Sequence, residues 1–177
     1  MLSSVRMTNM ADLRACGLWQ EYEAAFPREE RRSAVQQARA MAAEEAFHCL
    51  CLRDEEGVAG LLFYWQMPHG VFVEHLAICA ARRGQGLGHH ALRLLQQQGL
   101  PVVLEIEPPN TEPRRRRLRF YESAGFAVLP YPHVQPAYHA DTQPVPLVLL
   151  SCPGDISADD VLRFEAFQRD VVMLYAD

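Results

Sequence analysis

The sequence predicts an α+β fold built as a single domain over residues 1–177, and three observations lead to this prediction. The length of 177 residues, with 49% apolar and 22% charged side chains, suits one globular core. Strand-like and helix-like segments follow one another without repeats or low-complexity linkers. In the middle, an apolar strand, a glycine-rich loop, a helix and a second apolar strand form one continuous unit, which favours helices packed on a sheet.

The first half of the chain predicts two helices and four strands. Leu13, Cys16 and Trp19 are spaced as on a helix that starts near Asn9, and Phe26-Pro27 ends it. A second helix is expected where Ala, Gln, Arg and Glu dominate. A turn at residues 54–57 joins two strands into a hairpin. The expected elements are a strand at 2–7, helices at 9–26 and 29–45, and strands at 47–53, 58–67 and 71–79.

The second half predicts three helices and three strands. The first of these helices places Leu92 and Leu95 inward, and Gly99 ends it. Ser157, with Asp160 three residues later, resembles a capping box that starts a final apolar-striped helix. That helix is expected either to cover the sheet or to pair with a second chain in a homodimer. The expected elements are helices at 89–98, 114–123 and 155–177, strands at 101–107, 126–129 and 144–151, and an aromatic, proline-rich loop at 131–144.

Charge and hydropathy exclude several classes of function. No apolar run approaches the roughly 20 residues that span a bilayer, so no membrane association is expected. No signal peptide is visible at the N-terminus. The net charge of -5 argues against general nucleic-acid binding. The four arginines at residues 114–117 are the one strong basic run, which suits a site for one small polyanion.

The five cysteines predict free thiols. Their number is odd, they form no CxxC pair, and no further ligands stand at metal-site spacing, so no metal site is expected. Cys49 and Cys51 would share one face of a strand. Free thiols indicate a reducing compartment, and the cytoplasm is the expected location. The cysteines are Cys16, Cys49, Cys51, Cys79 and Cys152.

The glycine-rich loop at residues 83–88 is the decisive segment. Glycines let a backbone approach an anion, and the N–H groups at the following helix start point toward it. The Walker pattern fails because no lysine is present, and the Rossmann pattern fails because His89 stands where a glycine is needed. A glycine-rich turn that binds no ligand remains the alternative from this loop alone.

Two motifs in order resemble those of one known superfamily. Arg83 to Gly88 fits the pattern Arg/Gln-x-x-Gly-x-Gly/Ala, and Ile78 precedes it at the usual spacing. Downstream, residues 120–126 read Phe-Tyr-Glu-Ser-Ala-Gly-Phe. Together they resemble the GNAT superfamily of acetyl-CoA-dependent N-acetyltransferases, over about residues 58–150. The resemblance implies the GNAT fold: a central mixed, mostly antiparallel sheet, split by the cofactor cleft and flanked by helices, here with an extra C-terminal helix.

The resemblance also implies the coenzyme A site. Backbone groups of Leu76 and Ile78 would pair with the pantetheine amides, and N–H groups from Gly84 to His89 would hold the pyrophosphate. The Arg83 side chain would add positive charge. The residues expected to bind acetyl-CoA are Leu76, Ala77, Ile78, Arg83, Gly84, Gln85, Gly86, Leu87, Gly88, His89, Phe120 and Tyr121.

Two residues are candidates for catalysis. Tyr121 stands where family members place a tyrosine near the thioester sulfur, and its phenol would protonate the leaving thiolate; the alternative is a core residue. Glu74, a carboxylate within an apolar strand, is the candidate base, with a pKa raised by partial burial. His75 would point to the opposite face of a regular strand. A surface or hydrogen-bonded role for Glu74, or proton loss through a water chain, is left open.

The residues expected to bind the acceptor amine follow no recognisable motif. Arg114 stands where the family often has an asparagine, so some arginines of the run would reach a coenzyme A phosphate or simply form a solvated helix face. The acceptor is expected between residues 19–26 and 131–138. Glu21, Glu23 and Asp141 could attract a cation there, although aromatic loops also serve only to cover a core.

These observations predict an N-acetyltransferase that transfers an acetyl group from acetyl-CoA to a primary amine of a small molecule or peptide. Direct attack in a ternary complex is expected, because no cysteine of the motif has an evident histidine partner. The first alternative is a non-catalytic acyl-CoA binding or sensing module. The second is a nucleotide-binding domain, which would prefer ATP or NAD to coenzyme A.

Overall fold

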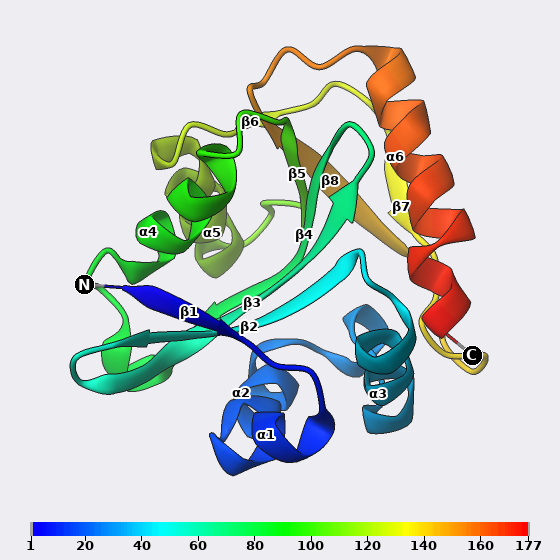
Figure 1. The fold of residues 1–177 in the computed structure, drawn as a ribbon. Helices are drawn as coiled ribbons and strands as arrows, with labels where there is room; N and C mark the ends of the chain where they lie inside the picture. Colours follow the sequence, from blue (N-terminus) through cyan, green and yellow to red (C-terminus); the bar gives the residue numbers. More distant parts are fainter. Residues whose placement is uncertain (1, 177) are drawn as a thin grey trace.

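An eight-stranded sheet runs through the computed structural model, which describes residues 2–176 (Figure 1). Its order is β1-β2-β3-β4-β5-β8-β6, and β7 pairs with β8 beside this path. Among the described strands, β4 and β5 run parallel and all other neighbours run antiparallel. The predicted mixed, mostly antiparallel sheet is therefore confirmed. The strands are β1 Ser3–Arg6, β2 Phe47–Asp54, β3 Gly57–Met67, β4 Gly70–Ile78, β5 Val102–Ile106, β6 Ala127–Val128, β7 His133–Gln135 and β8 Val145–Cys152.

Helices cover both faces of the sheet and enclose two hydrophobic cores (Figure 1). One core joins α1–α3 and α6 to the face that carries Phe63 and Trp65. The other joins α4 and α5 to the opposite face, which carries Leu62 and Tyr64. The helices are α1 Met10–Ala15, α2 Leu18–Ala25, α3 Ala34–Ala43, α4 Leu87–Gln96, α5 Glu112–Ser123 and α6 Ala158–Asp170, with 3-10 turns η1 Arg28–Glu30, η2 Ala80–Arg82 and η3 Val172–Tyr175.

Three segments differ from their predictions. The helix expected at 9–26 is two helices, because Gly17 adopts a left-handed φ of 77° between α1 and α2. The helix expected at 29–45 begins later, since Ser33 caps it in a capping box with Gln36, and η1 precedes it. The loop expected at 131–144 contains β7, three residues that pair with β8.

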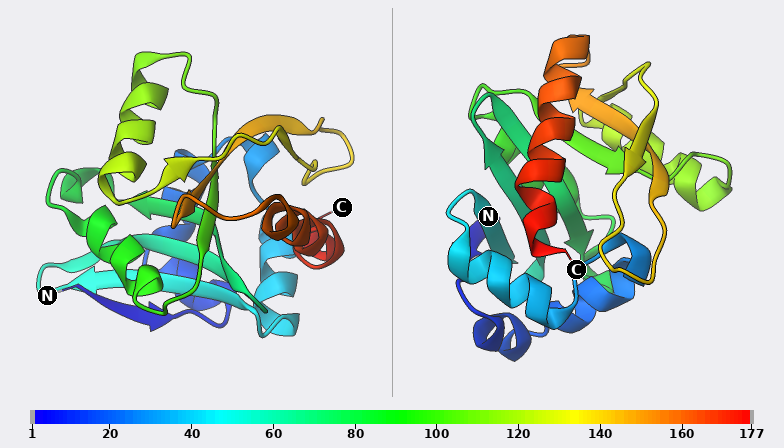
Figure 2. Two further views of the ribbon diagram at one scale, coloured as in Figure 1. Left: turned by 90° about the horizontal axis from the view of Figure 1, so that it is seen from above. Right: turned by 90° about the vertical axis from the view of Figure 1, so that its right-hand side faces the viewer.

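The C-terminal helix is confirmed as α6, with the capping box formed by Ser157 and Asp160, but it is shorter than the expected 155–177: it ends at Asp170, η3 follows, and residue 177 lies outside the described residues. The helix covers the sheet: the Phe164 ring lies 4.9 Å from that of Phe72 on β4. Beyond it, η3 contacts α3, as the right-hand view of Figure 2 shows. A homodimer stays a prediction. None of the helices between residues 2 and 176 is long and apolar enough to cross a membrane.

The sheet splits between β4 and β5, and this split positions the site. The two strands pair only from Val71 to Val73 on β4, opposite residues 102–104. On the other side of β4, a β-bulge leaves Glu74 without a partner on β3. After it, residues 76–78 still pair with β3 but no longer with β5. The gap between the unpaired edge of β4 and β5 corresponds to the split in the sheet that the sequence predicts.

Candidate functional site

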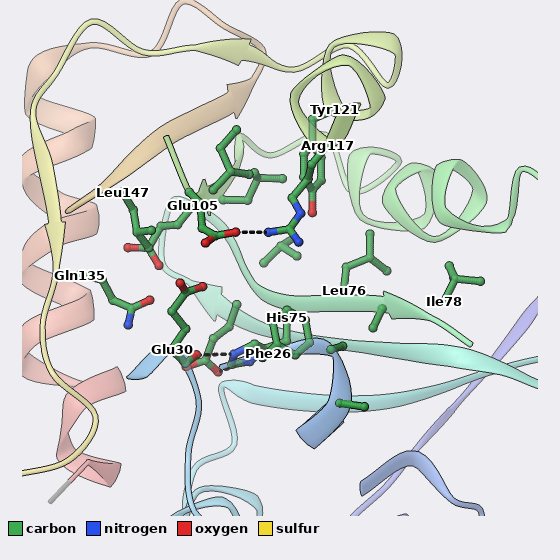
Figure 3. A pocket seen from close by; sticks show the side chains of 18 of the residues that line it. Phe26, Glu30, His75, Leu76, Ile78, Glu105, Arg117, Tyr121, Gln135 and Leu147 are labelled. Carbon is green, nitrogen blue, oxygen red and sulfur yellow. Dashed lines mark hydrogen bonds and ion pairs between the residues drawn. The ribbon is translucent and has the colours of Figure 1, made fainter. Parts of the chain in front are cut away.

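Two cavities meet at the free edge of β4. The loop cavity, of about 630 Å³, lies between the end of β4, the glycine loop and helices α4 and α5. The carboxylate cavity, of about 420 Å³, lies between β4, β5, η1 and β7, and four glutamates line it: Glu30, Glu74, Glu105 and Glu107. Figure 3 labels Glu30 and Glu105 in its wall. Because the two cavities share lining residues, they adjoin each other. The shared residues are Leu76, Ile78, Arg83, Arg117 and Tyr121.

The glycine loop presents free backbone amides to the loop cavity. Gly84 and Gly86 adopt left-handed φ angles of 79° and 73°, which favour glycine. Gly86 is the N-cap of α4, and no side chain caps the N–H groups of this first turn. A Cβ atom added at either glycine would meet nothing within 4 Å. The open helix start is therefore suited to an anion such as a pyrophosphate.

Gly88 is required for a different reason. Its φ is not left-handed, but an added Cβ would lie 2.9 Å from Cζ of Phe120. The glycine thus lets α4 pack closely on α5, which carries Tyr121. His89 adds a hydrogen bond of 2.8 Å between its Nε2 and Oγ of Ser123 on the same helix. The motif glycines hence serve both anion access and helix packing.

The structure brings most of the predicted cofactor residues together. Ten of the twelve line the loop cavity; Ala77 lines the carboxylate cavity instead, and the exposed Gln85 lines neither. Arg83 ties the loop to the strand, because its Nε donates to the carbonyl of Ile78 at 3.0 Å. The ten residues are Leu76, Ile78, Arg83, Gly84, Gly86, Leu87, Gly88, His89, Phe120 and Tyr121.

The four arginines at residues 114–117 of α5 make different contacts. Arg114 and Arg117 both bind the carboxylate of Glu107, at 2.5 and 3.2 Å. Arg115 pairs with Glu112 at 3.2 Å on the exposed face. Arg116 lines the loop cavity and forms no ion pair with a described residue. The run is therefore neither wholly a solvated face nor wholly a phosphate site.

Tyr121 lies where the two cavities join. Its ring packs between Phe120 and Phe126, at centroid distances of 5.0 and 5.9 Å, and its hydroxyl points into the carboxylate cavity (Figure 3). Burial raises the pKa of the phenol to about 12, so it stays protonated near neutral pH. A protonated hydroxyl at this junction can donate to an atom from either side.

Glu74, the candidate base, lies at the centre of a buried network. Its side chain is 1% exposed and its two oxygens each accept from Nη1 of Arg32 at 2.7 Å. Nε1 of Trp65 donates to the same carboxylate at 2.9 Å, and the Tyr138 hydroxyl at 2.5 Å. Arg32, itself 0% exposed, also donates to the carbonyl of Val172 in η3 at 3.1 Å.

The expected rise in the pKa of Glu74 is wrong. Burial is the largest single influence and would raise it, but the Arg32 guanidinium, His75 and the hydrogen bonds from Arg32 and Tyr138 together outweigh burial and hold the pKa below its ordinary value. The carboxylate is thus a fixed anion whose oxygens are occupied by donors. This arrangement favours the hydrogen-bonded role that the sequence left open.

The expected orientation of His75 is also wrong. Because Glu74 is the bulged residue, His75 points to the same face, and its Nδ1 lies 3.9 Å from the Glu74 carboxylate. Burial lowers the pKa of His75 to about 4, so the ring is neutral. Its Nε2 donates to the backbone carbonyl of Glu30 at 2.9 Å, which ties η1 to β4 (Figure 3).

Apart from Glu74, the glutamates of the carboxylate cavity were missed by sequence reasoning. Glu105 and Glu107 lie on or just after β5, two residues apart and therefore on one face. Glu105 bonds to His133 and, at 2.8 Å, to Nε2 of Gln168. Glu30 is half-buried, and none of the described residues bonds to its carboxylate. Burial, and then Glu107, raise the pKa of Glu30.

The acidic residues expected on the acceptor side lie elsewhere. Glu23 faces Arg31 at 3.6 Å and Asp141 binds Arg28 at 2.8 Å, and neither they nor Glu21 line the cavity. The predicted segments do contribute, through Phe26 and its two preceding alanines and through Gln135. Within residues 2–176 no group of His, Cys, Asp or Glu is placed to hold a metal ion, and the five cysteines are free thiols.

Comparison with known proteins is consistent with this geometry. The model of the acetyltransferase (GNAT) family matches residues 15–126. YjbC of Bacillus subtilis (strain 168), which carries the name of an acetyltransferase, is 31% identical over 104 residues. That match covers 57% of the chain, and the chain spans about half, 52%, of this relative's length.

Solved structures share the fold. A GNAT-family acetyltransferase from Bacteroides thetaiotaomicron superposes with a TM-score of 0.82 at 25% identity, covering 98% of both chains. An aminoglycoside 6'-N-acetyltransferase complexed with coenzyme A gives a TM-score of 0.61 at 14% identity, covering 85% of this chain and 95% of that one. Arabidopsis thaliana Naa50, in complex with a bisubstrate analogue, gives a TM-score of 0.59 at 18% identity, covering 85% of this chain and 97% of that one.

Proposed function

The chain belongs to the acetyltransferase (GNAT) family, and on this premise we propose that it transfers an acetyl group from acetyl-CoA to a primary amine of a small molecule or peptide. The observation that carries the proposal is that the two cavities adjoin at Tyr121, which lines both. A donor and an acceptor can meet there only if both are bound together. The geometry therefore supports transfer within a ternary complex.

The loop cavity fits coenzyme A by its own chemistry. The uncapped start of α4 and the left-handed glycines before it suit the pyrophosphate. The backbone of residues 76–78, which β5 leaves unpaired, suits the pantetheine amides. Arg116 adds a cation with no protein partner in the part of the chain that the structure describes. The relative solved with coenzyme A shows that the fold accommodates this ligand.

The thioester supplies an activated acyl carbon, and the chain supplies position and protons. The neutral amine forms the new C–N bond as the C–S bond breaks, and the amine proton leaves to base or water. Tyr121, held protonated by its raised pKa, is placed to donate to the leaving sulfur. The overall products are an N-acetyl amine and coenzyme A.

Glu74 as the base stays a prediction, but the network around it favours another route for the proton. An anion with a lowered pKa and three donors on its oxygens is a weak acceptor. Glu74 lines the carboxylate cavity but its side chain is only 1% exposed, whereas the half-buried Glu30 is accessible to water there. A water chain, which the sequence also leaves open, is the better supported path.

Tyr121→Phe tests the proposed function. An amine panel with acetyl-CoA, followed by release of free thiol, should show turnover by the wild type. We expect the substitution to lower kcat about a hundredfold, because it removes the proton donor, while calorimetry still shows coenzyme A binding. Tyr131→Phe is the matched control, since Tyr131 lines neither cavity. If Tyr121→Phe and the wild type had equal kcat, Tyr121 would not be the proton donor to the leaving sulfur.

The alternative is an acyl-CoA binding or sensing module without turnover. It would be supported by tight coenzyme A binding with no thiol release from any amine. A nucleotide-binding domain would instead bind ATP or NAD in preference to coenzyme A. The protonated phenol at the junction of two cavities favours the enzyme over both alternatives, because a module that only binds does not need a second cavity at the thioester end.

A further inference from the structure

The carboxylate cavity has a near end and a far end with respect to the donor. Residues shared with the loop cavity, among them Leu76 and Tyr121, mark the near end. Residues that line only the carboxylate cavity, among them Glu30, Gln135 and Leu147, mark the far end. Figure 3 shows these two groups on opposite sides of the space. A group bound beside Glu30 is therefore separate from the nitrogen that reacts.

At the far end, Glu30 is the carboxylate that lacks an ion-pair partner among the described residues. Glu107 is neutralised by Arg114 and Arg117, and Glu105 is bonded to His133, whose pKa these contacts raise against the effect of burial. Glu30 has no such partner among the described residues. Its pKa is raised because burial and neighbouring carboxylates disfavour its charge. A bound cation would relieve this repulsion, whereas a carboxylate would add to it.

The backbone that carries the Glu30 side chain is fixed by two contacts. The carbonyl of Glu30 accepts from His75 Nε2 at 2.9 Å, and Arg32, two residues later, is fixed by Glu74. On the same wall, Nδ1 of the 3% exposed His75 has no hydrogen-bond partner. Between the ends, the cavity wall is apolar, with Val73, Leu104 and Ile106 suited to a methylene chain.

We propose that Glu30 determines acceptor specificity by binding a second cationic nitrogen, so that the acceptor is an aliphatic diamine or polyamine rather than an amino acid. This inference rests on the proposed function. The reacting nitrogen lies at the near end by Tyr121, the alkyl chain lies against the apolar wall, and the distal ammonium lies between Glu30 and Glu105. The volume of about 420 Å³ suits a ligand of this size.

The test compares α,ω-diamines of increasing chain length with monoamines of equal carbon number and with ω-amino carboxylates. We expect kcat/KM for the best diamine to exceed that of its monoamine about tenfold, the effect of one charge-assisted hydrogen bond. The amino carboxylate should be the poorest of the three. Glu30→Gln should reduce the diamine-to-monoamine ratio several-fold, through KM of the diamine.

Glu29→Gln is the matched control. Glu29 is the neighbouring glutamate, is exposed and does not line the cavity, so its replacement should leave the ratio unchanged. Equal kcat/KM for diamines and monoamines, or a ratio that survives Glu30→Gln, overturns the inference but leaves the acetyltransferase intact. If no amine releases thiol, the diamine is titrated into the protein with coenzyme A. Binding that Glu30→Gln weakens then supports the inference, and absence of heat overturns it.

Discussion

The loop cavity and the carboxylate cavity bind by different means. The loop cavity is lined by two continuous stretches: residues 76–89 present backbone amides and glycines, and residues 113–121 of α5 present side chains. The carboxylate cavity presents side chains from η1, β4, β5 and β7, which are far apart in sequence. Backbone recognition is local and tolerates change in most side chains, whereas side-chain recognition depends on how the sheet brings distant segments together. Side-chain substitutions can therefore change the ligand that the carboxylate cavity binds while the loop cavity still binds the same ligand.

The two cavities are also held in shape by different interactions. Close backbone packing supports the loop cavity: at Gly60 of β3, an added Cβ would lie 2.2 Å from the carbonyl oxygen of Ala77. A buried ion pair supports the carboxylate cavity, because Arg32 links Glu74 of β4 to η3. Substitutions at these two supports should therefore have different consequences, and comparing them tests the distinction.

The largest effect is expected for Arg32→Met. It removes the partner of a 1% exposed carboxylate, and breaking a buried pair in this way costs about 3–5 kcal/mol. Urea unfolding should show this loss in the free energy of unfolding. The double variant Arg32→Met/Glu74→Gln should recover much of it, because no unpaired charge then remains buried. If the double variant is no more stable than Arg32→Met, the ion pair is not the support of this region.

The pH dependence of stability gives an independent check of the same pair. The folded-state pKa of Glu74 lies below its ordinary value of 4.5. Its contribution to stability is therefore fully present above that value and is lost as pH falls through the folded-state pKa. We expect the unfolding free energy of the wild type to fall more steeply in acid than that of the double variant. If the unfolding free energies of the two proteins fell equally with pH, the pKa of Glu74 would not be lowered in the folded state.

The next effect is expected for Gly60→Ala. The new Cβ would collide with the backbone of β4 at residues 77–78, where the strand borders the loop cavity. Overpacking of this kind costs about 1–3 kcal/mol, and the displaced strand end should raise the Kd for coenzyme A about tenfold or more. Calorimetry measures the Kd, and urea unfolding measures the stability.

Gly99→Ala is the control for Gly60→Ala. Gly99 has a left-handed φ of 73° and open space around it, and it lines neither cavity. We expect a loss of stability of about 1 kcal/mol from backbone strain, with coenzyme A binding unchanged. If both alanine variants lose affinity equally, reduced stability rather than displacement of β4 is the cause.

This contrast explains how much the sequence could predict. Most of the residues that line the loop cavity were predicted, because glycines at residues 84, 86 and 88 meet local backbone requirements that show as a motif. The positions of the strands along the chain, except β7, and of the C-terminal helix followed from periodicity and from the capping box at Ser157. The break at Gly17 was missed because helical spacing continues across it from Leu13 to Trp19.

The carboxylate cavity could not be predicted in the same way. The side chains that β4 contributes depend on the bulge at Glu74. Because of the bulge, His75 points to the same face as Glu74, whereas a regular strand would place it on the opposite face. The pKa of Glu74 depends on Arg32, which lies 42 residues earlier and carries no motif. Glu30 was placed inside an expected helix, and only the cap at Ser33 shows that it lies in a separate turn.

The smallest effect is expected for Arg116→Ala, which asks whether side chains also contribute to the loop cavity. Arg116 is exposed, lines that cavity and has no ion-pair partner in the part of the chain that the structure describes. An exposed cation near a phosphate contributes about 0.5–1 kcal/mol, so the Kd for coenzyme A should rise about two- to fivefold, less at high salt. Arg115→Ala is matched in exposure and charge, but Arg115 pairs with Glu112 outside the cavity, so its Kd should match the wild type. Equal changes for both variants would mean that only the overall charge of α5 matters, and that the backbone supplies the specific contacts of the loop cavity.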